Sequence, residues 1–144
     1  MLASGHELYN RLLESEIDVM ERLFGTFRFG RHDEPHPDGR MYDEAPIFRR
    51  VRSRLAVRYS KYWLDVGART THVPLERSAA DAVAAVERVL EQPDLVAELT
   101  LRPGDALFFA NHVVHHGRRS FEDEPNGKGP GRTLLRVWVG PDSP

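Results

Sequence analysis

The sequence predicts a single α+β domain in which helices come first and antiparallel strands follow. The length of 144 residues suits one domain. Capping residues and apolar residues at helical spacing dominate the first part of the chain, and they return in residues 78–92. From residue 97 onward, β-type residues are separated by turn-forming sequences. This order predicts an α+β fold whose strands belong to a sandwich or jelly roll.

Two short helices are expected at the start of the chain. Ser4 with Glu7 has the pattern of a capping box, a hydroxyl N-cap followed three residues later by a carboxylate. Ser15 with Asp18 repeats this pattern and predicts a second helix, which Gly25 would end. Apolar residues follow each cap at helical spacing.

The next segment is expected to contain short strands on either side of a loop. The stretch "TFRFGR" predicts a strand with Phe27 and Phe29 on one face. Residues 30–46 have the proline- and glycine-rich composition of a loop. "IFRRV" and "RLAVRYS" then predict two strands around a turn.

Two further helices and the final strands complete the prediction. "KYWLDVGA" indicates a short helix, and "SAADAVAAVERVLEQ" a longer one with Ser78 and Asp81 as its capping box and Pro93 after its end. Strands are expected in "AELTL", "ALFFA", "VVHHGR" and "TLLRVWV".

Composition excludes several classes of function. The net charge of -2 gives no general attraction to nucleic acid or membranes, and no apolar run approaches the roughly 20 residues of a membrane span. The absence of cysteine excludes disulfides and thiolate metal sites. The N-terminus lacks the pattern of a signal peptide, so we expect a cytoplasmic protein.

Three of the seven histidines lie close together at His112, His115 and His116. Imidazole is a common ligand of iron, zinc and copper. In a strand, His112 and His116 would share a face and His115 would point the other way. A metal site and an ordinary set of half-buried polar residues both fit this pattern.

Two arginines are expected to share a strand face in "GRTLLRVWV". Alternation places Arg132 and Arg136 on one face with Leu134 and Trp138. A buried guanidinium needs an anion, and its planar fork matches a carboxylate. The same arginines could instead reach water or pair with the acidic residues of the preceding loop.

The stretches "LRPGDALFFANHVVHHGRRSFEDEP" and "GRTLLRVWV" resemble the C-terminal part of the iron(II)/2-oxoglutarate dioxygenases of the taurine dioxygenase and clavaminate synthase-like group. "SGHELYNRLLE" and "YDEAPIFRRVRSRLAVRYSKYWL" resemble earlier segments of that family less specifically. The resemblance spans residues 4–139. It implies a double-stranded β-helix, or jelly roll, with flanking helices.

The resemblance also implies a role for three residues. His116 matches the family's last metal ligand, and Arg132 matches the arginine that anchors the distal carboxylate of 2-oxoglutarate. Arg136 matches an arginine that faces the primary substrate in some members. The implied cofactors are Fe(II) and the cosubstrate 2-oxoglutarate, and the implied reaction is the oxidation of a small organic substrate.

The family's other two metal ligands come from an H-x-D/E element in the N-terminal half of the domain. Because Met1 stands just before the first helix cap, we expect residues 1–144 to form a single partial domain without that half. The predicted fold is therefore a partial jelly roll, and the enzyme would be incomplete as this chain.

Three alternatives stay open. The chain could be a non-catalytic fragment, a small complete metal-binding barrel using His36, Asp38 and His116, or an anion-binding module using the arginine face alone. A small-molecule substrate is the expected partner, with no nucleic acid and no membrane. Unpaired strands also predict self-association.

Overall fold

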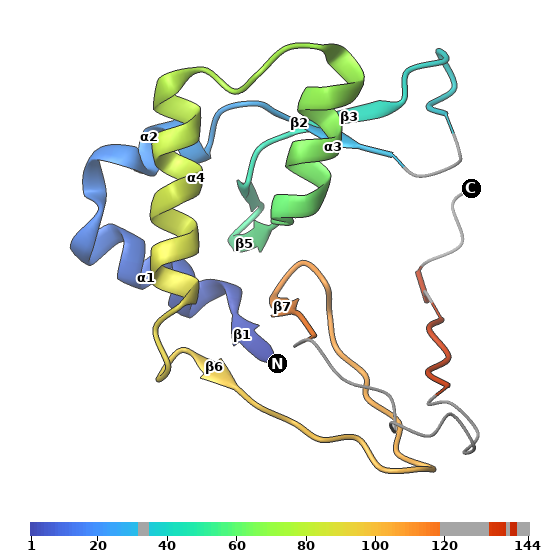
Figure 1. Ribbon diagram of the computed structural model, residues 1–144. Coiled ribbons are helices and arrows are strands. Elements are labelled where there is room, and N and C mark those ends of the chain that lie inside the picture. The colour runs from blue at the N-terminus through green and yellow to red at the C-terminus, as the bar shows by residue number, and fades with distance from the viewer. Residues whose placement is uncertain (32–34, 119–132, 138, 141–144) are drawn as a thin grey trace, which may run out of the picture.

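The computed structural model describes residues 1–31, 35–118, 133–137 and 139–140. Helices and short strands are mixed along the chain, which confirms the predicted α+β class (Figure 1). In chain order the elements are β1 (Leu2–Ser4), α1 (Gly5–Ser15), the 3₁₀ turn η1 (Ile17–Val19), α2 (Met20–Leu23), β2 (Phe27–Gly30), β3 (Tyr42–Ala45), β4 (Phe48–Val51), β5 (Arg54–Val57), α3 (Lys61–Thr71), α4 (Arg77–Leu90), β6 (Val96–Ala97) and β7 (Val114–His116).

The cap of the first helix is confirmed and the cap of the second is not. The Ser4 hydroxyl accepts a hydrogen bond from the backbone N–H of Glu7 at 3.3 Å, so α1 begins as predicted. The expected helix from Ser15 is instead a 3₁₀ turn followed by the four-residue α2. Ser15 lies at the end of α1, where its hydroxyl donates to the carbonyl of Arg11.

Two hairpins follow, and the first one extends into the predicted loop. The strand β2 is confirmed, with Phe27 and Phe29 both buried. Its partner β3 lies inside residues 30–46, where a loop was expected. Cross-strand pairing explains the difference, because Arg28 lies opposite Glu44 and its Nε donates to that carboxylate at 3.2 Å. The second hairpin, β4–β5, agrees with the prediction.

Both later helices form where they were predicted. α3 packs closely against β2, and a Cβ atom on the helical residue Gly67 would lie only 2.8 Å from the carbonyl carbon of Arg28. The N-cap of α4 is Glu76, so the helix starts one residue before Ser78. The Ser78 hydroxyl donates to the Glu76 carboxylate at 2.7 Å and does not cap the helix.

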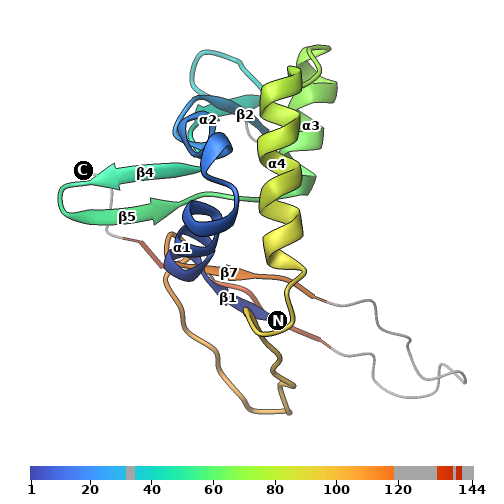
Figure 2. The ribbon, with the colours of Figure 1, turned by 90° about the vertical axis from the view of Figure 1, so that its left-hand side faces the viewer.

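The hydrophobic core lies between α1, α2, α4 and the hairpins. α4 contacts both N-terminal helices, and Figure 2 shows it running alongside α1 and α2. The apolar residues Ala79, Ala82, Val83, Ala85, Val86 and Val89 of α4 are buried. The largest fully buried side chains are Phe27, Phe29, Phe48, Leu8, Leu12, Leu23, Ile47, Leu64, Val86 and Val89. Within the described residues, no helix is long and apolar enough to cross a membrane.

The predicted C-terminal strands are only partly formed. β1 lies between β6 and β7 in a three-stranded antiparallel sheet, and the described residues show no closed barrel. The predicted strand "ALFFA" and the described residues of "TLLRVWV" have no strand structure. Of "AELTL" only Ala97 belongs to a strand, at the end of β6, and "VVHHGR" is reduced to β7. A strand needs a neighbour for its N–H and C=O groups, and β1 offers only three residues. The segment between β6 and β7 runs as an open loop away from the helices (Figure 1).

Candidate functional site

A hollow of about 1250 Å³ lies beside β7 and contains the residues that the sequence singled out. Its walls come from β1, the β2–β3 hairpin, the connection from β5 to α3, and β7. His112, His115, His116 and Arg136 all line it. The structure therefore brings together four of the predicted residues from two separate segments of the chain.

His116 is an exposed residue in the lining of this hollow and lies next to Arg136. The Arg136 Nη2 atom is 3.2 Å from the His116 Nε2 atom. The ring of Phe109 lies against the same imidazole, with 4.8 Å between ring centroids. Partial burial lowers the pKa of His116, and the positive charges of Arg136 and the N-terminus lower it further. A neutral imidazole can accept a hydrogen bond from the guanidinium.

β7 is held in place by the start of the chain. Leu2 pairs with His116 and Ala3 pairs with His115 in the antiparallel register of β1 and β7. The N-terminal amino group of Met1 donates to the carbonyl of Gly117 at 3.1 Å. The position of His116 therefore depends on pairing with the first residues of the sequence.

His115 also lines the hollow, but it occupies a different environment. Its ring meets the ring of Tyr59 edge-on, with 6.2 Å between centroids. Burial lowers the pKa of His115 to about 4, with a smaller contribution from the neighbouring His116. Its Nε2 atom is buried and has no hydrogen-bond partner among the described residues. We expected His115 to point away from the site, and this expectation was wrong, because His115 lines the hollow. Arg136 contacts His116 and not His115.

The outcomes for Arg132, Arg136 and His112 differ. Arg132 lies outside the described residues. Arg136 is exposed, so it does not need an anion to offset burial, as the sequence interpretation suggested. His112 is exposed at the rim, and its backbone carbonyl accepts a hydrogen bond from the N–H of Val57 at 2.9 Å.

Sequence reasoning missed a polar cluster in the wall behind His115. The Tyr59 hydroxyl donates to the Glu87 carboxylate, and burial together with this carboxylate raises the pKa of Tyr59. Asp43 accepts from Arg31 at 2.7 Å and from Arg58 at 2.9 Å. Burial opposes ionisation of Asp43, but the two arginines outweigh it and lower the pKa of this carboxyl group. Only long-range contacts create these pairs, so no local pattern could have predicted them.

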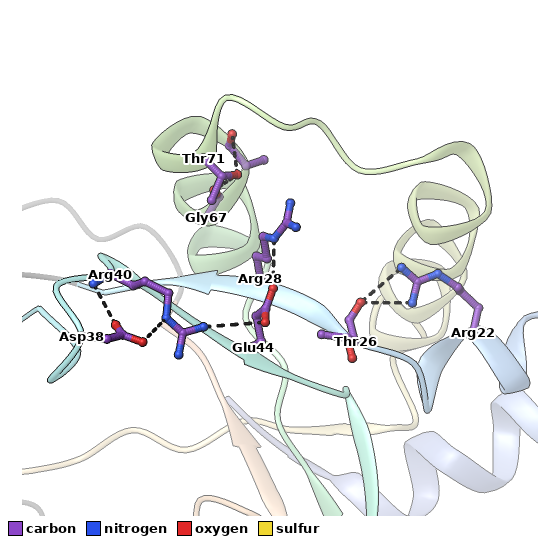
Figure 3. A network of polar contacts seen from close by, with 9 residues as sticks. Arg22, Thr26, Arg28, Asp38, Arg40, Glu44, Gly67 and Thr71 are labelled. Carbon is purple, nitrogen blue, oxygen red and sulfur yellow. Dashed lines mark hydrogen bonds and ion pairs between the residues drawn. The ribbon is translucent and has the colours of Figure 1, made fainter.

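The proposed triad of His36, Asp38 and His116 is wrong. His36 Nδ1 and Asp38 Oδ1 are 3.0 Å apart within a turn, where Asp38 also accepts from Arg40 Nε at 2.7 Å. Figure 3 shows Asp38 held by Arg40, which also reaches Glu44. Through the described parts of the chain, no group of three His, Asp or Glu side chains could hold a metal ion.

The described donors do not by themselves fit an iron(II) centre. A mononuclear iron(II) oxygenase site uses two histidines and one carboxylate. Among the described residues, His116 does not belong to any group of three side chains that could hold a metal ion. The Nε2 atom of His116 faces the guanidinium of Arg136 instead. Metal ligation by His116 is therefore a proposal that needs ligands beyond those described.

Comparison with known protein families assigns the chain to a family. No curated protein matches the chain. The family model described as "Taurine catabolism dioxygenase TauD, TfdA family" matches residues 1–138. That span includes β1, the core helices and the residues around the hollow, and it confirms the resemblance found in the sequence. The family implies an oxidoreductase of the Fe(II)/2-oxoglutarate dioxygenase type, and the chain belongs to the taurine catabolism dioxygenase TauD, TfdA family.

Proposed function

We propose that this chain carries the histidine–arginine part of an iron(II)/2-oxoglutarate-dependent dioxygenase site that oxidises a small organic substrate. The observation that carries the proposal is the contact of His116 with Arg136, whose side-chain nitrogens lie 3.2 Å apart in the lining of the hollow of about 1250 Å³. A hollow of this size can hold a small organic molecule. The family match supports the reaction type.

Each predicted residue has one proposed role. His116 is a metal ligand, Arg132 binds the distal carboxylate of 2-oxoglutarate, and Arg136 contacts the primary substrate. When bound, the iron and 2-oxoglutarate supply the activation of oxygen. The protein's part is to ligate and orient. Arg136 is exposed, so its side chain is free to leave the His116 nitrogen when a ligand replaces it.

We further propose that the described residues form part of a jelly roll and are inactive alone. One histidine does not make a ligand set of two histidines and a carboxylate. The described residues provide no such set. A non-catalytic role is the second candidate, and the guanidinium placed against the His116 nitrogen favours it. A cytoplasmic location and a small-molecule partner remain predictions.

The test is an assay for 2-oxoglutarate turnover by the purified 144-residue chain. We expect weak iron(II) binding and no succinate above the level of a His116→Ala variant. Iron titration of His116→Gln should lose the weak binding, whereas His112→Gln should keep it, because His112 is the matched exposed histidine of the same wall.

Two results would contradict parts of this proposal. Succinate formation that His116→Ala abolishes would show that the chain is a working enzyme. If His36→Ala also abolished it, the triad rejected above would be restored. Iron binding unaffected by His116→Gln would remove His116 as the ligand.

A further inference from the structure

A second hollow, of about 340 Å³, lies between the tip of the β4–β5 hairpin and α1. No residue lines both this hollow and the histidine-containing one. The hairpin side carries three arginines, and the α1 side carries polar and aromatic residues. The residues that matter here are Arg50, Arg52, Arg54, His6, Tyr9 and Asn10.

The hairpin concentrates positive charge in a chain that is slightly acidic overall. Residues 45–64 contain five arginines and one lysine and no aspartate or glutamate, whereas the whole chain has a net charge of -2. No aspartate or glutamate lines the hollow. The nearby acid of α1, Glu7, is held by Arg11 at 2.9 Å.

Within the described part of the chain, the three hairpin arginines have no ion-pair or hydrogen-bond partner. Arg50, Arg52 and Arg54 are all exposed, and no ion pair or side-chain hydrogen bond links any of them to another described residue. Arg22, Arg28 and Arg88, by contrast, each form an ion pair with a glutamate. The guanidinium groups of the tip therefore keep their full capacity for an external anion.

The tip of the hairpin is a tight turn with a defined register. Val51 pairs with Arg54, so Arg52 and Ser53 form a two-residue turn. Arg52 has a φ of 55°, a left-handed conformation that asparagine or glycine would adopt more easily in such a turn. The root of the hairpin is anchored by Phe48, which is fully buried. Figure 2 shows the hairpin projecting beside α1.

We propose that this hollow binds a small molecule that carries phosphate groups. The planar guanidinium fork matches phosphate oxygens, and a lining with three arginines, none of which has a partner among the described residues, favours a multiply charged anion over a single carboxylate. The volume lies at the lower end of the range for small-molecule sites, which favours a compact ligand over a polymer. Tyr9 and Asn10 on α1 add an aromatic wall and an amide for the rest of the molecule.

The test uses inorganic pyrophosphate as the probe and the full chain as the protein. Binding is followed by ³¹P NMR and by calorimetry, with sulfate as a competing simple anion. Arg50→Gln, Arg54→Gln and Arg52→Asn should each weaken pyrophosphate binding about tenfold, because each removes a charge-assisted hydrogen bond. Arg69→Gln, an exposed arginine of α3 that does not line the hollow, should bind like the unchanged chain.

Arg52→Asn separates binding from folding. Asparagine suits the left-handed turn position, so this variant should unfold at a higher temperature while it binds pyrophosphate less tightly. Arg136→Gln should leave pyrophosphate binding unchanged, so the result is independent of the proposed dioxygenase site. Equal displacement by sulfate, equal losses in Arg69→Gln, or binding of a single-stranded RNA but not of pyrophosphate would each overturn the proposal.

Discussion

Acidification should destabilise the protein through protonation of His115, at pH values above those at which its carboxyl groups become protonated. Burial against Tyr59 lowers the pKa of His115 to about 4 in the folded chain. The unfolded chain has the ordinary value of about 6.5. Above pH 6.5 the residue is neutral in both states and contributes nothing to pH dependence. Between pH 6.5 and 4 the unfolded state binds a proton that the folded state does not, so stability falls as pH falls.

The magnitude follows from the difference between these two pKa values. A difference of about 2.5 pH units at about 1.4 kcal/mol each gives roughly 3 kcal/mol, reached near pH 4. That is a large share of the 5–15 kcal/mol that is typical of a domain. The carboxyl groups whose pKa is lowered lose their contributions only as pH falls through about 4 and below, and they are Asp38, Asp43, Glu76 and Asp94.

Urea unfolding at several pH values between 7 and 4 measures this effect. We expect the unchanged chain to lose about 3 kcal/mol across that interval. His115→Gln should lose less, since glutamine does not titrate, and His116, whose pKa is also lowered, accounts for part of the loss that remains. His112→Gln, which changes an exposed histidine close by in the chain, should behave like the unchanged chain. Parallel losses in His115→Gln and the unchanged chain would refute the assignment to His115.

Two other predictions concern packing and association. Gly67→Ala should lower the free energy of unfolding by about 2–3 kcal/mol, because the new Cβ would lie 2.8 Å from the Arg28 carbonyl carbon. The control is Ala68→Ser, at the neighbouring, partly exposed position. Equal effects of the two substitutions in urea unfolding would contradict the packing argument. Phe108 is 87% exposed, so Phe108→Ser should reduce self-association in light scattering without lowering the unfolding midpoint, whereas unchanged scattering would remove this segment as the cause.

Local patterns predicted the Ser4 cap, the strand β2 and the helix α4. The cap depends on interactions within a few residues, and the spacing of apolar residues in β2 and α4 marks the faces that become buried, so the sequence displays these features directly. β3 was missed because its stability comes from pairing with β2, including the Arg28–Glu44 contact. The proline- and glycine-rich composition before it indicated a loop and concealed the strand.

The candidate site could be predicted only as a set of residues. Spacing and family resemblance singled out His116 and Arg136, and the structure places them in contact. The same spacing also suggested His36 with Asp38, which instead form a turn with Arg40. Convergence of side chains depends on how distant strands pair. The Tyr59–Glu87 contact, between β5–α3 and α4, carries no sequence signal at all for the same reason.

The exposed apolar side chains and the His116–Arg136 contact have a common physical origin. Residues 106–110 and 133–137 have the apolar composition of strands, yet they have no strand structure, and Phe108 and Leu135 are 87% and 88% exposed. A ladder fixes a side chain by fixing its backbone register. Residues 133–137 have no such ladder. Among the described residues, the guanidinium of Arg136 is positioned by its hydrogen bond to His116. Pairing of residues 133–137 with a further strand would bury Leu135 and set the guanidinium by register, which would leave the His116 nitrogen available to a metal. The same event would therefore reduce association and strengthen iron binding, and these two measurements should change together.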